Sequence, residues 1–210
     1  MKQSNTLWKA TYDADTPEEM LHAYSGWASD YDHDTVKGMG YVGPTLSFEQ
    51  LDTYLDSKNA RVLDAGCGTG LVGEIMKDQG YSRVDAMDLS REMLAEAKNK
   101  NVYNNVFKAD MSRRLDIDDD RYDAIICVGT FTYAHVGPEA FKEMVRVTKP
   151  DGHIVFTIRD GAYQEYNYRE TMVELEADKT WELLEMRQED YLKKENVTAN
   201  YCAYRVRGDH

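Results

Sequence analysis

The chain has 210 residues, of which 38 are acidic and 25 are basic, so its formal net charge is −13. This length suits one domain, and the acidic balance argues against a nucleic-acid binder, which normally carries a basic patch. The longest apolar stretch has about six residues, whereas a membrane span needs about 20. With no secretory pattern at the N-terminus, we expect a soluble protein of the cytoplasm, with the nucleus as a second option.

The N-terminal part, residues 1–57, reads as helical. Thr16 is placed as an N-cap before a proline and two acids, and aromatic residues recur at helical spacing as far as Tyr31. A second helix is expected after the glycine-rich run GMGYVGP. Residues 1–56 hold ten acids against three lysines. As a hypothesis, this segment forms an acidic lid that favours a neutral or cationic small molecule.

From residue 60 onwards, strand-like and helix-like runs alternate, which predicts a parallel sheet with helices on both faces. Residues 181–192 and 197–207 are separated by too few residues for a helical crossover, so they should pair antiparallel. The sequence therefore predicts one α/β domain whose core, residues 58–210, is an open seven-stranded sheet, mostly parallel, that ends in an antiparallel hairpin. The five parallel strands are expected at residues 61–66, 83–88, 105–110, 122–129 and 153–159.

The three cysteines are widely spaced and form no C-x-x-C pair. Their odd number and spacing indicate ordinary reduced cysteines, with neither a disulfide framework nor a metal site. They are Cys67, Cys127 and Cys202.

The clearest motif is VLDAGCGTG, residues 62–70, where a strand leads into alternating glycines and a helix begins near Leu71. Glycines allow the backbone to approach a ligand closely, and the N-terminus of the following helix favours an anionic group. Asp88 closes the next strand, where a carboxylate can accept hydrogen bonds from both hydroxyls of a ribose. Ser90 already serves as the N-cap there, so capping does not explain Asp88.

Two ligand classes compete for this motif. Residues 68–73 match G-x-G-x-x-G, and Asp88 lies 20 residues after Gly68, as in nicotinamide dinucleotide enzymes. However, the glycine at the strand end is Gly66, and Asp64 has no role in that fingerprint. An NAD(P)-dependent oxidoreductase therefore stays as the less favoured alternative.

The string VLDAGCGTG resembles motif I of the class I S-adenosylmethionine-dependent methyltransferases, and the resemblance covers most of the chain. It implies a Rossmann-like fold, with S-adenosylmethionine as cofactor and S-adenosylhomocysteine as product. KADM resembles the segment in which Asp110 would bond the adenine amino group, with Met111 nearby. YDAIICVGTF resembles motif IV. KPDGHIVFT resembles the turn before the fifth strand of the family, with the mild departure that Asp151-Gly152 replaces a glycine pair.

The N-terminal run GWASDYDHDTVKGMGYVGP resembles, more narrowly, the methyltransferase-like family of the Williams–Beuren syndrome region. In such relatives the region of Trp27 and Tyr31 covers the methionine end of the cofactor. Asp64 either orients the glycine turn or binds the methionine amine. The cofactor contacts implied by the resemblance are Trp27, Tyr31, Asp64, Gly66, Cys67, Gly68, Thr69, Gly70, Asp88, Leu89, Met93, Asp110, Met111, Val128 and Gly129, with Thr130 beside them.

The sequence says less about the residues that would bind the methyl acceptor. The loop after the fourth strand offers Tyr133 and His135, and His135 is either a general base or a solvent-facing residue. The segment after the fifth strand offers Arg159, Tyr163, Tyr166 and Tyr168, whose tyrosines either form a pocket for a cationic amine or pack on a lid. The NPPY-type signature of amide and adenine N-methyltransferases is absent, because motif IV reads VGTF.

These observations predict methyl transfer from S-adenosylmethionine to a small molecule, with a protein side chain as a second option. A non-catalytic S-adenosylmethionine-binding module that regulates a protein partner is the main alternative. We expect a monomer without a bound metal.

Overall fold

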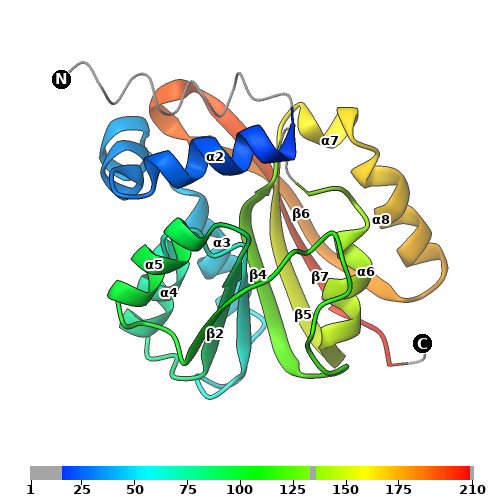
Figure 1. The fold of residues 1–210 in the computed structure, drawn as a ribbon. Coiled ribbons are helices and arrows are strands. Elements are labelled where there is room, and N and C mark those ends of the chain that lie inside the picture. Colours follow the sequence, from blue (N-terminus) through cyan, green and yellow to red (C-terminus); the bar gives the residue numbers. More distant parts are fainter. Residues whose placement is uncertain (1–15, 133–135, 209–210) are drawn as a thin grey trace.

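A computed structural model describes residues 16–132 and 136–208 (Figure 1). Seven strands form one sheet in the order β3-β2-β1-β4-β5-β7-β6. The strands from β3 to β5 run parallel, and β7 lies antiparallel between β5 and β6. The predicted mostly parallel sheet with its antiparallel end hairpin is thus confirmed. The strand bounds are β1 (Val62–Ala65), β2 (Val84–Asp88), β3 (Asn105–Lys108), β4 (Tyr122–Phe131), β5 (Thr148–Arg159), β6 (Trp181–Leu192) and β7 (Val197–Val206).

Helices cover both faces of the sheet, as Figure 1 shows. Side chains alternate between the faces along each strand, so Val62 and Leu63 belong to different core clusters. The cluster of Val62 includes Leu51 and Met76 from α3 and α4. One face carries α3 (Gly43–Asp52), α4 (Leu71–Asp78) and α5 (Arg91–Asn99), and the other carries α6 (Ala140–Val147), α7 (Ala162–Glu165) and α8 (Tyr168–Ala177).

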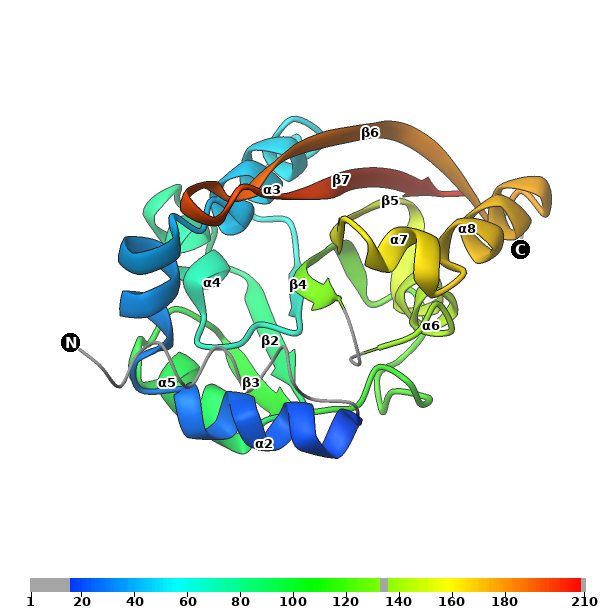
Figure 2. The same ribbon diagram turned by 90° about the horizontal axis from the view of Figure 1, so that it is seen from above.

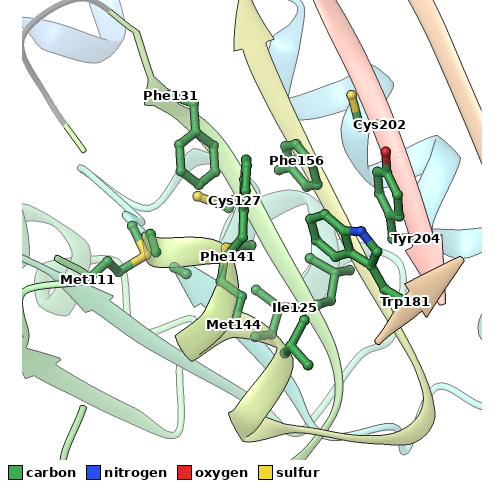
Figure 3. Close-up of a cluster of buried hydrophobic side chains, with 14 of the residues drawn as sticks. Met111, Ile125, Cys127, Phe131, Phe141, Met144, Phe156, Trp181, Cys202 and Tyr204 are labelled. Atoms are coloured by element: carbon green, nitrogen blue, oxygen red, sulfur yellow. The ribbon is translucent and has the colours of Figure 1, made fainter. Parts of the chain in front are cut away.

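The larger core cluster is rich in aromatic rings and supports the carboxyl half of β4 (Figure 3). The ring centroids of Phe131 and Phe141 lie 4.9 Å apart, and those of Trp181 and Tyr204 lie 4.0 Å apart. These four side chains are almost completely buried. Because such close packing resists deformation, it fixes the strand end that carries Gly129.

Several element boundaries differ from the sequence-based expectation. The first helix, α2 (Pro17–Trp27), is shorter than the aromatic spacing suggested, and a π-helical segment, η1 (His33–Met39), follows it. The Thr16 hydroxyl accepts a hydrogen bond from the Glu19 N–H at 3.2 Å, as expected of an N-cap. Strand β5 begins at Thr148, earlier than the expected start at residue 153, because Thr148 already pairs with Tyr122 of β4.

The N-terminal segment, defined here as residues 16–42, lies over the carboxyl edge of the sheet, while α3 packs on a face. Seen from above, α2 passes beside β2 and β3, and the turn of the β6–β7 hairpin lies beside the chain between α2 and α3 (Figure 2). Two backbone hydrogen bonds join the hairpin to this chain, from Val42 N–H to the Tyr191 carbonyl at 3.0 Å and from Lys193 N–H to the Gly40 carbonyl at 3.1 Å. The hairpin turn contains the short helix η2 (Lys193–Glu195), which the sequence pattern did not indicate.

Across the two described ranges, every helix is too short or too polar to cross a membrane. All three cysteines are buried and unpaired.

Candidate cofactor and acceptor site

A cavity opens at the carboxyl ends of β1, β2 and β4, and α2 forms part of its wall. Ligands of open α/β sheets bind at this edge. The structure places most of the predicted cofactor residues along this cavity, together with Met20, Leu21 and Tyr24 of α2. The predicted residues that line it are Tyr31, Asp64, Gly66, Cys67, Gly68, Thr69, Asp88, Leu89, Met93, Asp110, Met111, Val128 and Gly129, with Thr130.

The glycine turn begins where β1 ends. The N–H groups of Gly66 and Cys67 both donate to the Met87 carbonyl of β2, at 2.8 and 3.0 Å, which ties the turn to the neighbouring strand. Gly66 has a φ of 75°, and a Cβ at this position would collide with the Thr130 hydroxyl. Only glycine fits here, because the backbone is left-handed and the neighbouring strand leaves no space. Gly70 caps α4 and faces Tyr103 and Ala97, so it supports the turn without lining the cavity.

Asp88 is held in a fixed orientation at the end of β2. Its Oδ2 accepts the Gly68 N–H at 2.9 Å, and its Oδ1 accepts the Ser90 N–H at 2.8 Å. Burial raises the pKa of Asp88, and the N–H donors of Ser90 and Gly68 oppose that rise. A carboxylate offers about four acceptor positions, so these backbone donors leave room for a ligand hydroxyl. Ser90 caps α5 by accepting the Met93 N–H at 3.2 Å, as the sequence indicated.

Asp64 belongs to the cavity wall and keeps one buried carboxylate oxygen unsatisfied. Its side chain is only 1% exposed, and Oδ2 accepts a hydrogen bond from the Tyr103 hydroxyl. Among the described residues, Oδ1 has no hydrogen-bond partner. Burial raises the pKa of Asp64 to about 7, a rise that the Tyr103 hydrogen bond opposes and the Asp88 charge increases. A buried oxygen of this kind is stabilised by a ligand that donates a hydrogen bond, above all a cationic amine.

Beyond Asp88, the cavity combines a polar rim with apolar walls. Asp110 follows β3, and its carboxylate accepts from the Ser112 N–H at 3.0 Å and pairs with Arg113 at 3.3 Å. Met93 and Met111 supply apolar wall, and Leu89 is 38% exposed, which is high for a leucine. An apolar slot with a carboxylate at its rim suits a planar base that carries an amino group.

The N-terminal segment is fastened to the glycine turn. Asp32 accepts a hydrogen bond from the Thr69 hydroxyl and pairs with Lys100 Nζ at 2.6 Å. Lys100 also pairs with Glu74 at 2.6 Å. These contacts place the ring of Tyr31 in the cavity wall.

Trp27 lies behind Tyr31 rather than in the cavity wall. The two rings meet edge to face with centroids 4.8 Å apart, and the indole N–H donates to Asp34 at 3.1 Å. Trp27 therefore positions Tyr31 instead of facing a ligand.

Sequence reasoning missed a pair of tyrosines beside Gly129. Tyr41 and Tyr191 are 150 residues apart in the chain, yet their hydroxyl oxygens lie 3.1 Å apart. Gly129 has a φ of 80°, and a Cβ there would lie 2.8 Å from the Tyr191 hydroxyl and 2.9 Å from that of Tyr41. The nearest sequence signal was the GMGYVGP break around Tyr41, and no signal marked Tyr191.

The predicted acceptor residues lie elsewhere. The described wall of the cavity lacks Arg159, Tyr163, Tyr166 and Tyr168. Tyr168 belongs to the larger core cluster, and the other two tyrosines pack against it. This favours the packing interpretation of those tyrosines. Tyr133 and His135 lie outside the described residues. Within the described residues, no group of three or more His, Cys, Asp or Glu side chains could hold a metal ion.

Comparison with known proteins gives a consistent set of relatives. The methyltransferase domain family matches residues 63–156. The chain is 31% identical over 171 residues to methyltransferase-like protein 27 of Homo sapiens, covering 78% of this chain and 69% of the relative. It is 32% identical over 151 residues to malonyl-acyl-carrier-protein O-methyltransferase of Buchnera aphidicola, covering 71% of this chain but only 58% of that relative.

Among solved structures, the (4+2)-cyclase SpnF has a TM-score of 0.70 and 15% identity, and the match covers 93% of this chain and 97% of that one. At that identity the likeness concerns the fold alone. Because the fold hosts more than one chemistry, the function has to be argued from the site.

Proposed function

This chain belongs to the methyltransferase family, and from that premise we propose that it transfers a methyl group from S-adenosylmethionine to a neutral or cationic small molecule. The observation that carries the proposal is the row of groups along the carboxyl edge of the sheet. Asp110, Asp88 and Asp64 follow or belong to the adjacent strands β3, β2 and β1, and all three line one cavity.

The residues present fit S-adenosylmethionine. Neighbouring strands are about 4.8 Å apart, so groups on β3 and β4 are separated by roughly 14 Å, a span that suits a nucleoside with an amino-acid tail. The slot at Asp110 would hold the adenine, and Asp88 the ribose hydroxyls. The free Oδ1 of Asp64 would accept the amine of the methionine part, and the glycine turn would lie against its carboxylate. When bound, the cofactor supplies a methyl group activated by a sulfonium.

The contribution of the protein is then orientation and exclusion of water. The N-terminal segment closes the cavity through its contacts with Thr69 and Lys100. Burial raises the pKa of the Cys67 thiol and of the Tyr31 and Tyr41 hydroxyls well above their ordinary values, so these groups stay neutral. An acceptor that needs no deprotonation by the protein, such as a free amine, suits this environment.

The charge of the cavity bears on the acceptor. Along its described wall there are three aspartates and no lysine, arginine or histidine. A carboxylate or phosphate acceptor would meet these acids and, among the described residues of the wall, no cationic side chain. We therefore do not extend the malonyl acceptor of the bacterial relatives to this chain.

The competing proposal is a module that binds S-adenosylmethionine without turnover. Neutral tyrosines and a protonated thiol are as compatible with binding as with catalysis, so this candidate is kept. A turnover assay separates the two proposals.

The test is incubation of the protein with methyl-labelled S-adenosylmethionine and a panel of amines, alcohols, thiols and carboxylates. S-adenosylhomocysteine and labelled product are then followed by mass spectrometry. We expect labelled product from amines or neutral acceptors and none from carboxylates. Tight cofactor binding without product from any acceptor would favour the non-catalytic module, and preferential methylation of carboxylates would contradict the proposed acceptor charge.

A further inference from the structure

We propose that the Tyr41 hydroxyl, positioned by the Tyr191 hydroxyl behind it, forms the acceptor end of the cavity and that the group it receives there is an amine nitrogen. This assignment rests on the proposed function and specifies its substrate class. It concerns a pair of residues that the sequence did not indicate.

Tyr41 lines the cavity beyond Asp110, Asp88 and Asp64, and Tyr191 is buried behind it, outside the described wall. Asp110, Asp88 and the glycine turn belong to the β3, β2 and β1 side of the carboxyl edge, whereas Gly129 lies on β4, one strand further along. Both hydroxyls lie over Gly129, where a single added carbon would touch them. The Gly129 N–H donates to the Thr157 hydroxyl of β5 at 2.9 Å, which fixes this backbone.

The surrounding chain holds the two rings in place. Tyr41 forms an antiparallel bridge with Leu192, next to Tyr191, and the ring centroids of the pair lie 4.9 Å apart, edge to face. Beneath them is Gly43, where a Cβ would lie 2.6 Å from the Tyr41 ring and 2.9 Å from that of Tyr191. The hairpin turn brings Tyr191 to this position, as Figure 2 shows for the turn and the chain before α3. The site is therefore built before any ligand arrives, which lowers the entropy cost of binding.

The chemistry of the pair favours a hydrogen-bond donor as its ligand. A hydroxyl has one hydrogen and two acceptor lone pairs, so the Tyr41 oxygen keeps at least one lone pair whichever way the mutual bond runs. An amine that attacks a methyl group must direct its own lone pair away from the protein and its N–H groups towards acceptors. The Tyr41 oxygen meets that need, and Asp64 and Asp88 in the same cavity favour the positive charge that develops on the nitrogen.

The transfer step balances without a base. An acceptor that arrives as an ammonium ion first loses a proton to water, and the lone pair of the resulting free amine forms the new N–C bond as the bond between methyl carbon and sulfur breaks. The positive charge passes from sulfur to nitrogen, and the nitrogen then loses a proton to water. The tyrosines orient the nitrogen and take no proton.

The test uses the full chain saturated with S-adenosylhomocysteine and titrated calorimetrically with benzylamine, benzyl alcohol and benzoate. These three probes share a ring and differ only in the head group. The variants are Tyr41→Phe and Tyr191→Phe, which keep the rings and remove the hydroxyls. Tyr81→Phe is the matched control, because that buried hydroxyl bonds Asp52 at 2.6 Å outside the cavity wall.

We expect benzylamine to bind most tightly and benzoate least. We expect Tyr41→Phe and Tyr191→Phe each to weaken benzylamine binding about tenfold. The affinity for S-adenosylhomocysteine should change less than threefold in all variants, and Tyr81→Phe should bind benzylamine as the wild type does. Unchanged amine binding in Tyr41→Phe, tighter binding of benzoate, or no binding of benzylamine would overturn the assignment. Failure of S-adenosylhomocysteine itself to bind would instead overturn the proposed function, and the assignment with it.

Discussion

The carboxyl group of Asp64 links the chemistry of the cavity to the stability of the protein. An aspartate in water ionises near pH 4, but burial raises the pKa of Asp64 to about 7 in the folded chain. The folded state therefore holds a proton on Asp64 between these values, while the unfolded chain does not. The stabilising contribution of this proton is complete below about pH 4 and is lost as the pH rises through about 7.

We predict that the free energy of unfolding of the wild type falls, relative to Asp64→Asn, by roughly 1.4 kcal/mol per pH unit between pH 5 and 7. The reason is that asparagine cannot ionise. Urea unfolding of both proteins without ligand at pH 5, 6, 7 and 8 measures the difference. Asp116→Asn, at an exposed position, is the control and should follow the wild type. Parallel pH profiles for the wild type and Asp64→Asn would contradict the prediction.

A second residue-scale prediction concerns the glycine turn. Gly66→Ala and Gly80→Ala both place a side chain at positive φ, and each should cost about 1 kcal/mol for that reason. A Cβ at Gly80 meets no atom within 4 Å, whereas one at Gly66 collides with Thr130. Gly66→Ala should therefore lower the free energy of unfolding by about a further 1–3 kcal/mol, measured by urea denaturation. Equal losses in the two variants would mean that the turn has room to adjust.

For single residues, the sequence predicted those site positions that a local motif marks. Asp64, Gly66 and Asp88 lie at or near the ends of predicted strands, and in the structure all three line one cavity. Tyr41 and Tyr191 could not be predicted, because their contact depends on how far the β6–β7 hairpin bends towards the chain before α3. No local pattern records that bend.

Among the elements, the N-terminal segment decides how closed the cavity is. Asp32 joins it to Thr69 of the glycine turn and to Lys100 at the end of α5, and Ser25 of α2 donates to Glu92 of α5 at 2.8 Å. The Asp32 contacts are only partly buried and the Ser25–Glu92 contact is exposed, so each contributes modestly to stability. Their common effect is to hold Tyr31 against the cavity.

We predict that Lys100→Ala loosens this segment without unfolding the protein. Loss of its pairs with Asp32 and Glu74 should cost about 0.5–1 kcal/mol, which corresponds to roughly two- to fivefold weaker binding of S-adenosylmethionine. Amide hydrogen exchange should become faster in residues 16–42 and stay unchanged in β1 and β4. Lys98→Ala is the control, because Lys98 is exposed on the same helix. Exchange that is unchanged in residues 16–42 would show that Lys100 does not hold the segment.

The strands and most helices could be predicted because apolar periodicity and glycine or proline boundaries are local. The segment between Trp27 and Gly43 could not, since its π-helical conformation depends on contacts with the hairpin and the glycine turn. The start of β5 was placed too late for a similar reason. The pairing of Thr148 with Tyr122 lengthens β5 at its N-terminal end, and no local sequence pattern marks that pairing.

For the molecule as a whole, the net charge of −13 acts together with the three aspartates of the cavity. A negative field draws cations towards the site, and salt screens that field over about 8–10 Å at physiological strength. The mostly parallel type of the sheet could be predicted from the sequence, because repeated βαβ units place parallel strands side by side. The charge of the acceptor was only a hypothesis from the sequence, and the absence of a cation from the described wall now supports it.

We predict that raising KCl from 50 to 500 mM increases the KM of an amine acceptor severalfold and leaves that of a neutral acceptor nearly unchanged. The physical reason is loss of long-range attraction for the cation alone. Initial rates at saturating S-adenosylmethionine measure both constants. If the two acceptors responded equally to salt, the field of the protein would have no part in selecting the acceptor.

The central claim is that the cavity at the carboxyl edge holds S-adenosylmethionine through Asp88. It is tested most directly by calorimetric titration of the purified protein with S-adenosylmethionine, S-adenosylhomocysteine and NADH in parallel, repeated with Asp88→Ala. We expect micromolar binding of the first two, at least tenfold weaker binding in the variant, and no binding of NADH. Binding of NADH alone, or affinity for S-adenosylmethionine that Asp88→Ala leaves unchanged, would contradict the assignment of this site.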